Sequence, residues 1–142
     1  MIRIITKFAL AGLLLLTCAT AAGAQTIEDA SRRTIGYISS SGTVEGPGRR
    51  TIGYIHADGT VENASRGTLG FLKSNGTVEG PSRTTLGFVR SNGTVENASR
   101  TTLGYVRSNG RIEDRSNKTV GYAKGVAANH AAIFFFFFFK PK

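Results

Sequence analysis

The chain is poor in the residues that carry most catalytic and metal-binding chemistry. Among its 142 residues it has one cysteine, two histidines and no tryptophan. His56 and His130 lie at unrelated points of the sequence, which argues against a site built from several histidines. No glycine-rich loop leads into a helix, as a phosphate-binding loop would require. We therefore expect no catalytic residue, no metal and no cofactor, and we predict that the protein is not an enzyme.

The start of the chain has no hydrophobic run long enough for a transmembrane helix. A short apolar run at residues 8–16 follows Arg3 and Lys7, and small residues continue to Ala24. This pattern is typical of a secretory signal peptide cleaved after Ala24, whereas a membrane-spanning helix needs about 20 apolar residues. We predict that residues 1–24 are a signal peptide and that the protein is exported, to the periplasm, the cell surface or the medium.

The single cysteine, Cys18, lies inside this predicted leader. The stretch "LLTC" loosely resembles a lipobox, so a lipoprotein attached through Cys18 is the alternative to cleavage after Ala24. With cleavage after Ala24 the mature chain has no cysteine for a nucleophile or a disulfide. Its fold must then be held by packing and hydrogen bonds alone.

Acidic residues are scarce relative to basic ones, with 9 against 18, and the net charge is +9. A basic balance attracts anionic partners, but no long run of lysine and arginine concentrates this charge, and solubility explains it more simply. We expect no nucleic-acid partner. An envelope glycan or an envelope protein remains a candidate partner.

The main feature of the sequence is a repeat of 17 residues, in units 34–50, 51–67, 68–84, 85–101 and 102–118. Each unit begins with an extended piece such as "TIGYI", rich in β-branched and aromatic residues, which we call the a strand. A turn such as Asn-Gly or Asp-Gly follows, a strong hairpin signal because both residues tolerate positive φ. A second extended piece such as "TVE", the b strand, completes the unit.

The ends of the array predict a closed ring. Residues 26–33 form a b strand and its turn with no a strand before them, and residues 119–125 form an a strand with no b strand after it. The two halves complement each other, and their pairing would remove exposed sheet edges. We predict an all-β fold in which residues 25–125 form a closed ring of about six 17-residue β-hairpin repeats.

The recurrent "TxGY…NGTVE…SR" hairpins, followed by an Ala-rich segment and a phenylalanine run, resemble the bacterial β-flower proteins, known in four-fold and five-fold forms. The resemblance covers residues from about Thr26 to Phe139. It implies hairpin petals around a central axis and no assigned activity. The chain departs from the family names in its number of units, which is six.

Repetition converts each position of the unit into a ring of like residues. The aromatic residue of the a strand and the aliphatic residue two positions before it share one strand face, which we predict to be the core. The central glycine between them weakens a strand unless something approaches it closely, so we predict crowding near the axis or an aromatic ring of the neighbouring petal lying over it. These structural glycines are Gly36, Gly53, Gly70, Gly87, Gly104 and Gly121.

Charged residues also form rings. A glutamate in each b strand is followed four residues later by an arginine in five of the six copies, which predicts local ion pairs; a cation site on converging carboxylates is the alternative. A basic position just after the a strand is incomplete, because Ser39 and His56 occupy it in the first two copies. The candidate ligand face consists of Lys73, Arg90, Arg107 and Lys124.

The segment at residues 126–142 contains six consecutive phenylalanines, Phe134, Phe135, Phe136, Phe137, Phe138 and Phe139. As a helix, residues 126–139 would span roughly 21 Å, short of a bilayer core of about 30 Å. The run has neither helical nor strand periodicity, so its rings need burial on several sides. We predict that this segment forms a short helix or strand packed on or in the ring, as a plug in the pore or across one mouth.

These features favour an exported structural or binding module of the bacterial cell envelope whose ligand the sequence does not identify. The alternative is a membrane-associated protein that uses the phenylalanine run as its anchor. The two readings differ in where the phenylalanine side chains lie.

Overall fold

The computed structural model describes residues 24–141. The predicted signal peptide, with Cys18 and the alternative of lipidation, lies outside the described residues apart from Ala24. The repeat region and the C-terminal segment are described throughout, except for Lys142.

The described chain forms twelve short strands followed by two short helical segments. Strands that correspond to the predicted a strand begin at the threonine of each unit, because the β-branched and aromatic residues that follow favour extended backbone. The a strands are β3 (Thr34–Ile38), β5 (Thr51–Ile55), β7 (Thr68–Leu72), β9 (Thr85–Val89), β11 (Thr102–Val106) and β13 (Thr119–Tyr122). The b strands are β2 (Gln25–Asp29), β4 (Thr43–Glu45), β6 (Thr60–Asn63), β8 (Thr77–Glu79), β10 (Thr94–Asn97) and β12 (Arg111–Asp114).

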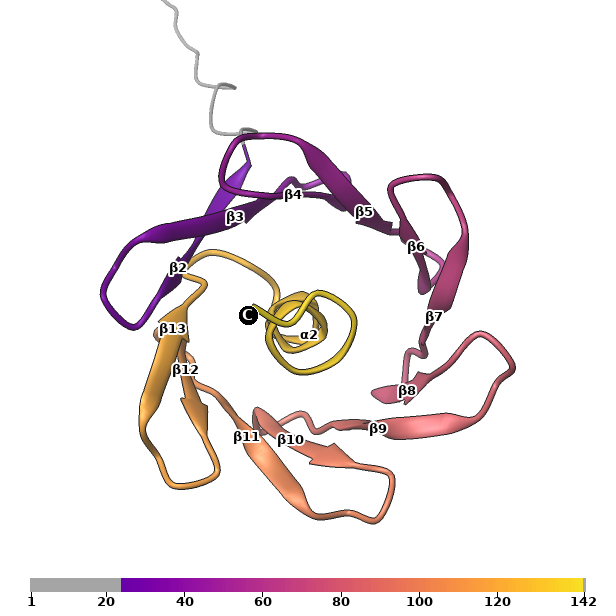
Figure 1. The fold of residues 1–142 in the computed structure, drawn as a ribbon. Coiled ribbons are helices and arrows are strands. Elements are labelled where there is room, and N and C mark those ends of the chain that lie inside the picture. The colour runs from indigo at the N-terminus through magenta and orange to yellow at the C-terminus, as the bar shows by residue number, and fades with distance from the viewer. Residues whose placement is uncertain (1–23, 142) are drawn as a thin grey trace, which may run out of the picture.

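All twelve strands pair in antiparallel order to form one closed barrel. The barrel closes where the last strand meets the first: in β13 and β2, Gly121 pairs with Asp29 and Tyr122 pairs with Glu28. The predicted complementarity of the two half-units is therefore confirmed, and the ring has no free edge (Figure 1). The all-β ring of six repeats follows from this pairing.

Successive strands are joined by two kinds of turn. Between an a strand and the following b strand, a glycine with φ between 90° and 95° makes the tight turn, as Gly42 and Gly59 do. Between a b strand and the next a strand the register shifts by one residue, and these hairpins point outward as the petals of the ring (Figure 1). The petals are therefore b-to-a hairpins, whereas the Asn-Gly turns lie between neighbouring petals.

In the first five outward turns the sequence alternates between two forms, Asn/Asp-Ala-Ser-Arg and Gly-Pro-Gly/Ser-Arg, which build the turn in different ways. In the first form the Asn63 side-chain oxygen accepts hydrogen bonds from the backbone N–H groups of Ser65 and Gly67, both at 2.9 Å. In the second form Pro47 supplies a fixed φ instead. Both forms place the residue before the last turn position in the left-handed region, with φ between 66° and 71°; these residues are Arg32, Arg49, Arg66, Arg83, Arg100 and Asn117.

The core lies on the strand face opposite to the predicted one. In β3 the residues Gly36 and Ile38 are buried, whereas Ile35 and Tyr37 are only partly buried. Val44 of β4 pairs with Ile38 and is fully buried. The assignment of the aromatic residues to the core was therefore wrong: they lie on the outer face of the barrel, and the glycine face turns inward. Most of the neighbouring aliphatic residues are partly buried and pack against the core, namely Ile35, Ile52, Leu69, Leu103 and Val120.

The glycine face can line the core because the C-terminal segment supplies the missing side chains. The chain turns inward after β13 and forms α2 (Ala128–Ala132) and the π-helix η3 (Ile133–Phe137) along the centre of the ring (Figure 1). Ala131, Ala132 and Ile133 have no exposed surface. The predicted packing of a short apolar segment in the ring is confirmed.

Each of the six phenylalanines lies against one of the six structural glycines. A Cβ added to Gly36 would come within 3.0 Å of Phe134 Cζ, and one added to Gly121 within 2.6 Å of Phe135 Cε1. The predicted crowding at the glycines is confirmed, but the aromatic ring over each glycine comes from the tail and not from the neighbouring petal. The pairs are Phe134 with Gly36, Phe135 with Gly121, Phe136 with Gly104, Phe137 with Gly87, Phe138 with Gly70, and Phe139 with Gly53.

The order of these pairs explains why the tail departs from an α-helix. Each successive phenylalanine contacts the glycine of the preceding repeat around the ring, so six residues complete one circuit. One residue must then turn by about 60°, whereas an α-helix with 3.6 residues per turn turns by about 100° and would skip petals. The wider π-helical turn, with Phe138 N–H bonded to the Ile133 carbonyl at 3.1 Å, brings the rotation closer to the symmetry of the ring.

Candidate functional site

The outer wall of the ring carries the charged side chains, because the interior is filled. Tyr37 and Glu45 pair directly across β3 and β4, so that an aromatic ring and a carboxylate stand side by side on this wall. The same pairing recurs around the barrel, for example between Phe88 and Glu96. The polar chemistry of the molecule therefore lies in the junctions between petals.

Three of the four predicted ligand-face residues contact a glutamate of their own repeat. Arg90 donates from Nε and Nη2 to one oxygen of Glu96, at 3.0 and 2.7 Å. Arg107 binds Glu113 at 2.8 Å, and Lys73 Nζ lies 3.8 Å from Glu79. These three residues do not form a free basic face, because each is largely neutralised by its glutamate.

Lys124 differs from the other three members of this set. Among residues 24–141 no carboxylate lies within 4.0 Å of its ammonium group, although Glu28 occupies the position that a partner would take. His56 fills the same place in the second copy and bonds Glu62 at 2.7 Å through Nε2. Lys124 is therefore the member of the predicted face whose charge is available to a ligand.

Four of the five left-handed arginines make two contacts, whereas Arg100 contacts only the Phe88 ring, at 4.2 Å. Arg49 lies 3.7 Å above the centre of the Tyr37 ring, and its Nη1 lies 3.3 Å from Glu45. The predicted local ion pairs are present in four copies, namely Arg32 with Glu28, Arg49 with Glu45, Arg66 with Glu62, and Arg83 with Glu79. Cation–π contacts of this kind contribute about 0.5–1 kcal/mol at exposed sites, so they brace the outer wall.

The same contact extends across the closure. Arg32 of the first half-unit lies 3.6 Å above the ring of Tyr122 in the last half-unit. Two segments 90 residues apart in the chain thus reconstruct the arrangement that other repeats form internally. The junction between β13 and β2 therefore has the same arginine–aromatic contact as other junctions of the ring.

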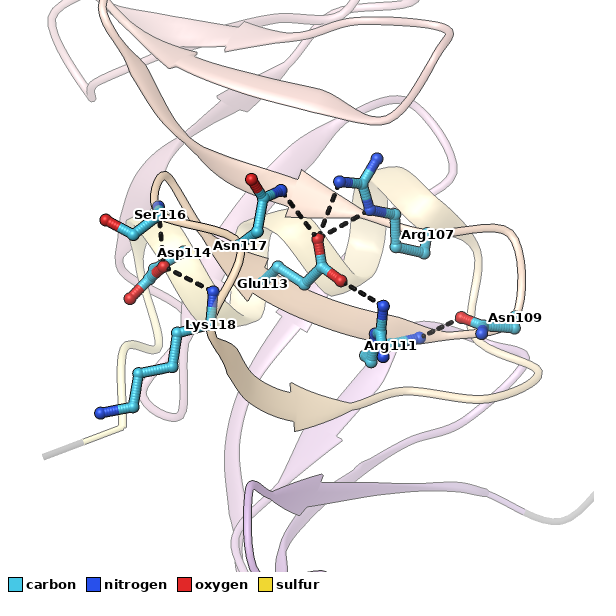
Figure 2. A network of polar contacts seen from close by, with 8 residues as sticks. All are labelled: Arg107, Asn109, Arg111, Glu113, Asp114, Ser116, Asn117 and Lys118. Carbon is cyan, nitrogen blue, oxygen red and sulfur yellow. Dashed lines mark hydrogen bonds and ion pairs between the residues drawn. The ribbon is translucent and has the colours of Figure 1, made fainter.

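Glu113 is the most enclosed carboxylate of the wall, with 3% of its side chain exposed. It accepts hydrogen bonds from Arg107 at 2.8 Å and Asn117 at 3.2 Å, and Arg111 Nη2 lies 2.6 Å from its other oxygen (Figure 2). These contacts, led by the hydrogen bond from Arg107, hold the pKa of Glu113 below its usual value. The carboxylate is therefore a structural anion that orients two arginines.

A large groove of the outer wall lies at the closure, and we call it the seam groove. Its volume is about 860 Å³, and the groove is lined by β12, β13 and β2 together with Gly125. Arg111 pairs with Tyr122, and Tyr122 pairs with Glu28, so these three residues form a row across three strands. Asn109, Lys124 and Gln25 line the same groove beyond this row.

The seam groove is an enlarged version of a groove that the ring repeats. Beside Arg90 the equivalent groove measures about 510 Å³ and contains the bidentate pair of Arg90 with Glu96. At the seam no turn joins β13 to β2, because the chain passes inward from Gly125 to α2. The missing turn and the unpaired Lys124 leave the seam groove open.

Lys124 was predicted from the sequence as a ligand-face residue, whereas Arg111, Arg32 and Tyr122 were not predicted to line the same groove. A signal for Arg111 was present: the five other b strands have threonine at this position, and only the last has arginine. Tyr122 and Arg32 gave no such signal, because they conform to the repeat. Their meeting with Arg111 depends on how the ring closes.

The other chemistry considered from the sequence has no counterpart in the part of the chain that the structure describes. Residues 24–141 contain no group of three or more His, Cys, Asp or Glu side chains that could hold a metal ion. The glutamates point outward at separate junctions rather than toward a common centre, and arginines or lysines occupy several of their oxygens. A cation site on converging carboxylates is not formed.

This architecture, a closed ring of outward-pointing β-hairpins around a central apolar segment, defines a flower-like repeat protein. The sequence profile described as "5-fold beta-flower protein" matches residues 24–140. The chain therefore belongs to the five-fold β-flower family, as the repeat motifs indicated, although its own ring has six a strands and six b strands. Searches of curated proteins and of solved structures gave no match.

Proposed function

We propose that this β-flower is an exported, non-enzymatic binding module of the bacterial cell envelope that engages its ligand on the outer wall. The single observation that carries this proposal is the filled pore, in which the tail occupies the axis and meets every petal. A ligand then has only the outer surface, where grooves lined by arginine, glutamate and an aromatic residue recur. The signal-peptide pattern at residues 1–24 supports the exported location.

Most of the charged groups of the wall that are described above are held by neighbouring side chains, which favours binding over acid–base catalysis. Glu113 is held by three neighbours, and Arg90 binds Glu96 with two nitrogens. Groups tied in this way orient each other and are not free to exchange protons with a substrate. The wall is suited to recognition.

The alternative of membrane anchoring requires the same phenylalanine side chains that the ring uses. Phe134 is 2% exposed and Phe135 is 8% exposed. No helix within residues 24–141 has the length and apolar character needed to cross a membrane. Anchoring by the tail would therefore first have to withdraw rings that stabilise the barrel, by about 1.5–3 kcal/mol for each buried phenylalanine.

The export part of the proposal is tested by expressing the full chain in a bacterial host, fractionating the cells and measuring the intact mass of the product. We expect an exported protein that begins at Gln25. A product that keeps residues 1–24 in the cytoplasm would contradict the proposal, and a mass showing a lipid on Cys18 would identify the lipoprotein alternative.

The binding part is tested by sedimenting the mature protein with purified cell-wall material at low salt, alongside flotation with liposomes. We expect co-sedimentation that weakens as salt is added, because screening shortens the range of charge attraction to about 10 Å at 0.1 M. Flotation with liposomes that depends on residues 133–142, without co-sedimentation, would instead favour the membrane anchor.

A further inference from the structure

We propose that the seam groove is a binding site for an acidic glycan whose carboxylate is held between Arg111 and Lys124. This inference deepens the proposed function by naming a site and a ligand class, and it rests on that function. It starts from the place where the ring is closed by two chain ends rather than by a turn.

In the seam groove the basic residues outnumber the carboxylates by three to one. Arg32, Arg111 and Lys124 line it, and Glu28 is the single carboxylate among its lining residues. Arg32 is shared between Glu28 at 3.4 Å and the face of Tyr122. Lys124 has no carboxylate partner within 4.0 Å among residues 24–141.

Arg111 is fixed in a position that suits a bound carboxylate. Its Nη2 lies 2.6 Å from Glu113, while 46% of its side chain remains exposed (Figure 2). A guanidinium group has five N–H donors, so one contact leaves donors free for a planar carboxylate. Its backbone is also fixed, because its N–H donates to the Asn109 side-chain oxygen at 3.0 Å.

The remaining lining residues favour a glycan over a more densely charged polyanion. Asn109 and Gln25 offer amide groups, which both donate to and accept from sugar hydroxyls. Glu28 accepts hydrogen bonds from hydroxyls but repels a second nearby anion. An acidic glycan carries one carboxylate on each sugar and hydroxyl groups between the carboxylates. Its carboxylate would contact the cations of the groove, and its hydroxyls would contact the amides and Glu28.

The repeat itself supplies the variants for the test. Arg111→Thr restores the residue of the other five b strands, and Lys124→Ser restores the residue that Ser39 provides in the first copy. Lys118→Thr is the matched control: it also removes one positive charge and restores a residue found in other copies, Thr84 and Thr101, but it lies outside the groove. All three variants should therefore fold, which thermal denaturation checks.

Binding is measured by calorimetry on the mature protein at low salt, with an oligogalacturonate as the acidic glycan. A neutral maltooligosaccharide and polyglutamate serve as comparison probes. We expect Arg111→Thr and Lys124→Ser each to weaken oligogalacturonate binding by about tenfold or more, as for a lost charged hydrogen bond. Lys118→Thr should leave it within about twofold, and both comparison probes should bind more weakly.

Four outcomes would overturn the inference. Equal weakening by Lys118→Thr, or equal binding of polyglutamate, would show general charge attraction rather than a site. Failure of the wild-type protein to bind oligogalacturonate would reject the ligand class. Co-sedimentation with cell-wall material that neither groove variant changes would reject the seam site while leaving the proposed binding function intact.

Discussion

The fit between the phenylalanine run and the glycine ring predicts a graded loss of stability along the tail. Phe134 is 2% exposed, lies over Gly36, and packs edge-on against Phe135 with ring centroids 5.4 Å apart. Replacing a buried phenylalanine by alanine costs about 3–5 kcal/mol, because it removes apolar burial and leaves a cavity. Phe138 is only partly buried, so Phe138→Ala should cost less, about 1–2 kcal/mol.

The free energy of unfolding is measured by urea denaturation of the mature protein, and the melting temperature gives a second readout. For a domain of this size each kcal/mol shifts the melting temperature by about 4 °C, so Phe134→Ala should lower it by about 12–20 °C. Phe134→Leu tests volume, since it keeps most of the buried area. Leu86→Ala is the surface control, because Leu86 is 37% exposed.

The reasoning would be refuted if Phe134→Ala cost no more than Leu86→Ala. It would also be refuted if Phe134→Ala and Phe138→Ala cost the same, because the gradient follows from the burial along the tail. A large loss of stability for Phe134→Ala with a small loss for Phe138→Ala would support a tail that is most tightly packed where it leaves the helix and less so toward its end.

Three further predictions follow from the same packing and from the outer wall. Deleting residues 133–142 should leave an unfilled apolar ring that aggregates or melts at lower temperature, as seen by size exclusion and thermal denaturation; a deletion variant as soluble and heat-resistant as the parent would contradict the plug. Gly121→Ala should destabilise by about 1–3 kcal/mol, because its Cβ would lie 2.5 Å from the Glu28 carbonyl oxygen, whereas a Cβ at Gly48 meets nothing within 4 Å and Gly48→Ala should be neutral in the same assay. The lowered pKa of Glu113 means that its contribution to stability is present above about pH 4.5 and is lost as the pH falls through the folded-state pKa; Glu113→Gln should flatten this acid limb of the stability curve, and an unchanged limb would contradict the network.

The ring could be predicted from the sequence because the residues that indicate it recur in every unit. The 17-residue spacing, the Asn-Gly turns and the complementary half-units each recur or appear at both ends, so the strand order and the closure followed from counting. The inward face could not be predicted in the same way. Period-two alternation identifies two faces but does not say which faces the core, and Tyr37 appeared the better core residue than Gly36.

The choice of face depends on a segment 98 residues further along the chain from Gly36. A strand with glycine on its inner face has too little volume to fill a barrel, and Phe134 supplies that volume from outside the repeat. The sequence predicts that the phenylalanine run needs burial on several sides. The pairing of each phenylalanine with one glycine could not be predicted, because it depends on the geometry of the ring. The local sequence therefore predicts which residues share a face of the strand. Which of the two faces points to the core depends on the tertiary arrangement.

The candidate site follows from the place where the repeat is interrupted. A six-fold ring has equivalent junctions, and in three of them a lysine or arginine just after the a strand pairs with the glutamate of the following b strand, as Arg90 does with Glu96. Closure by two chain ends removes one turn, and the inward path of the tail takes the backbone away from the junction at Gly125. The same tail that fills the pore thereby opens the seam groove, so the step that completes the core also creates the surface that differs from the rest of the ring. Recognition at a single site on a repetitive wall then depends on two residues. Arg111 stands where the other b strands have threonine. Lys124, unlike Lys73, Arg90 and Arg107, has no carboxylate within 4.0 Å among residues 24–141.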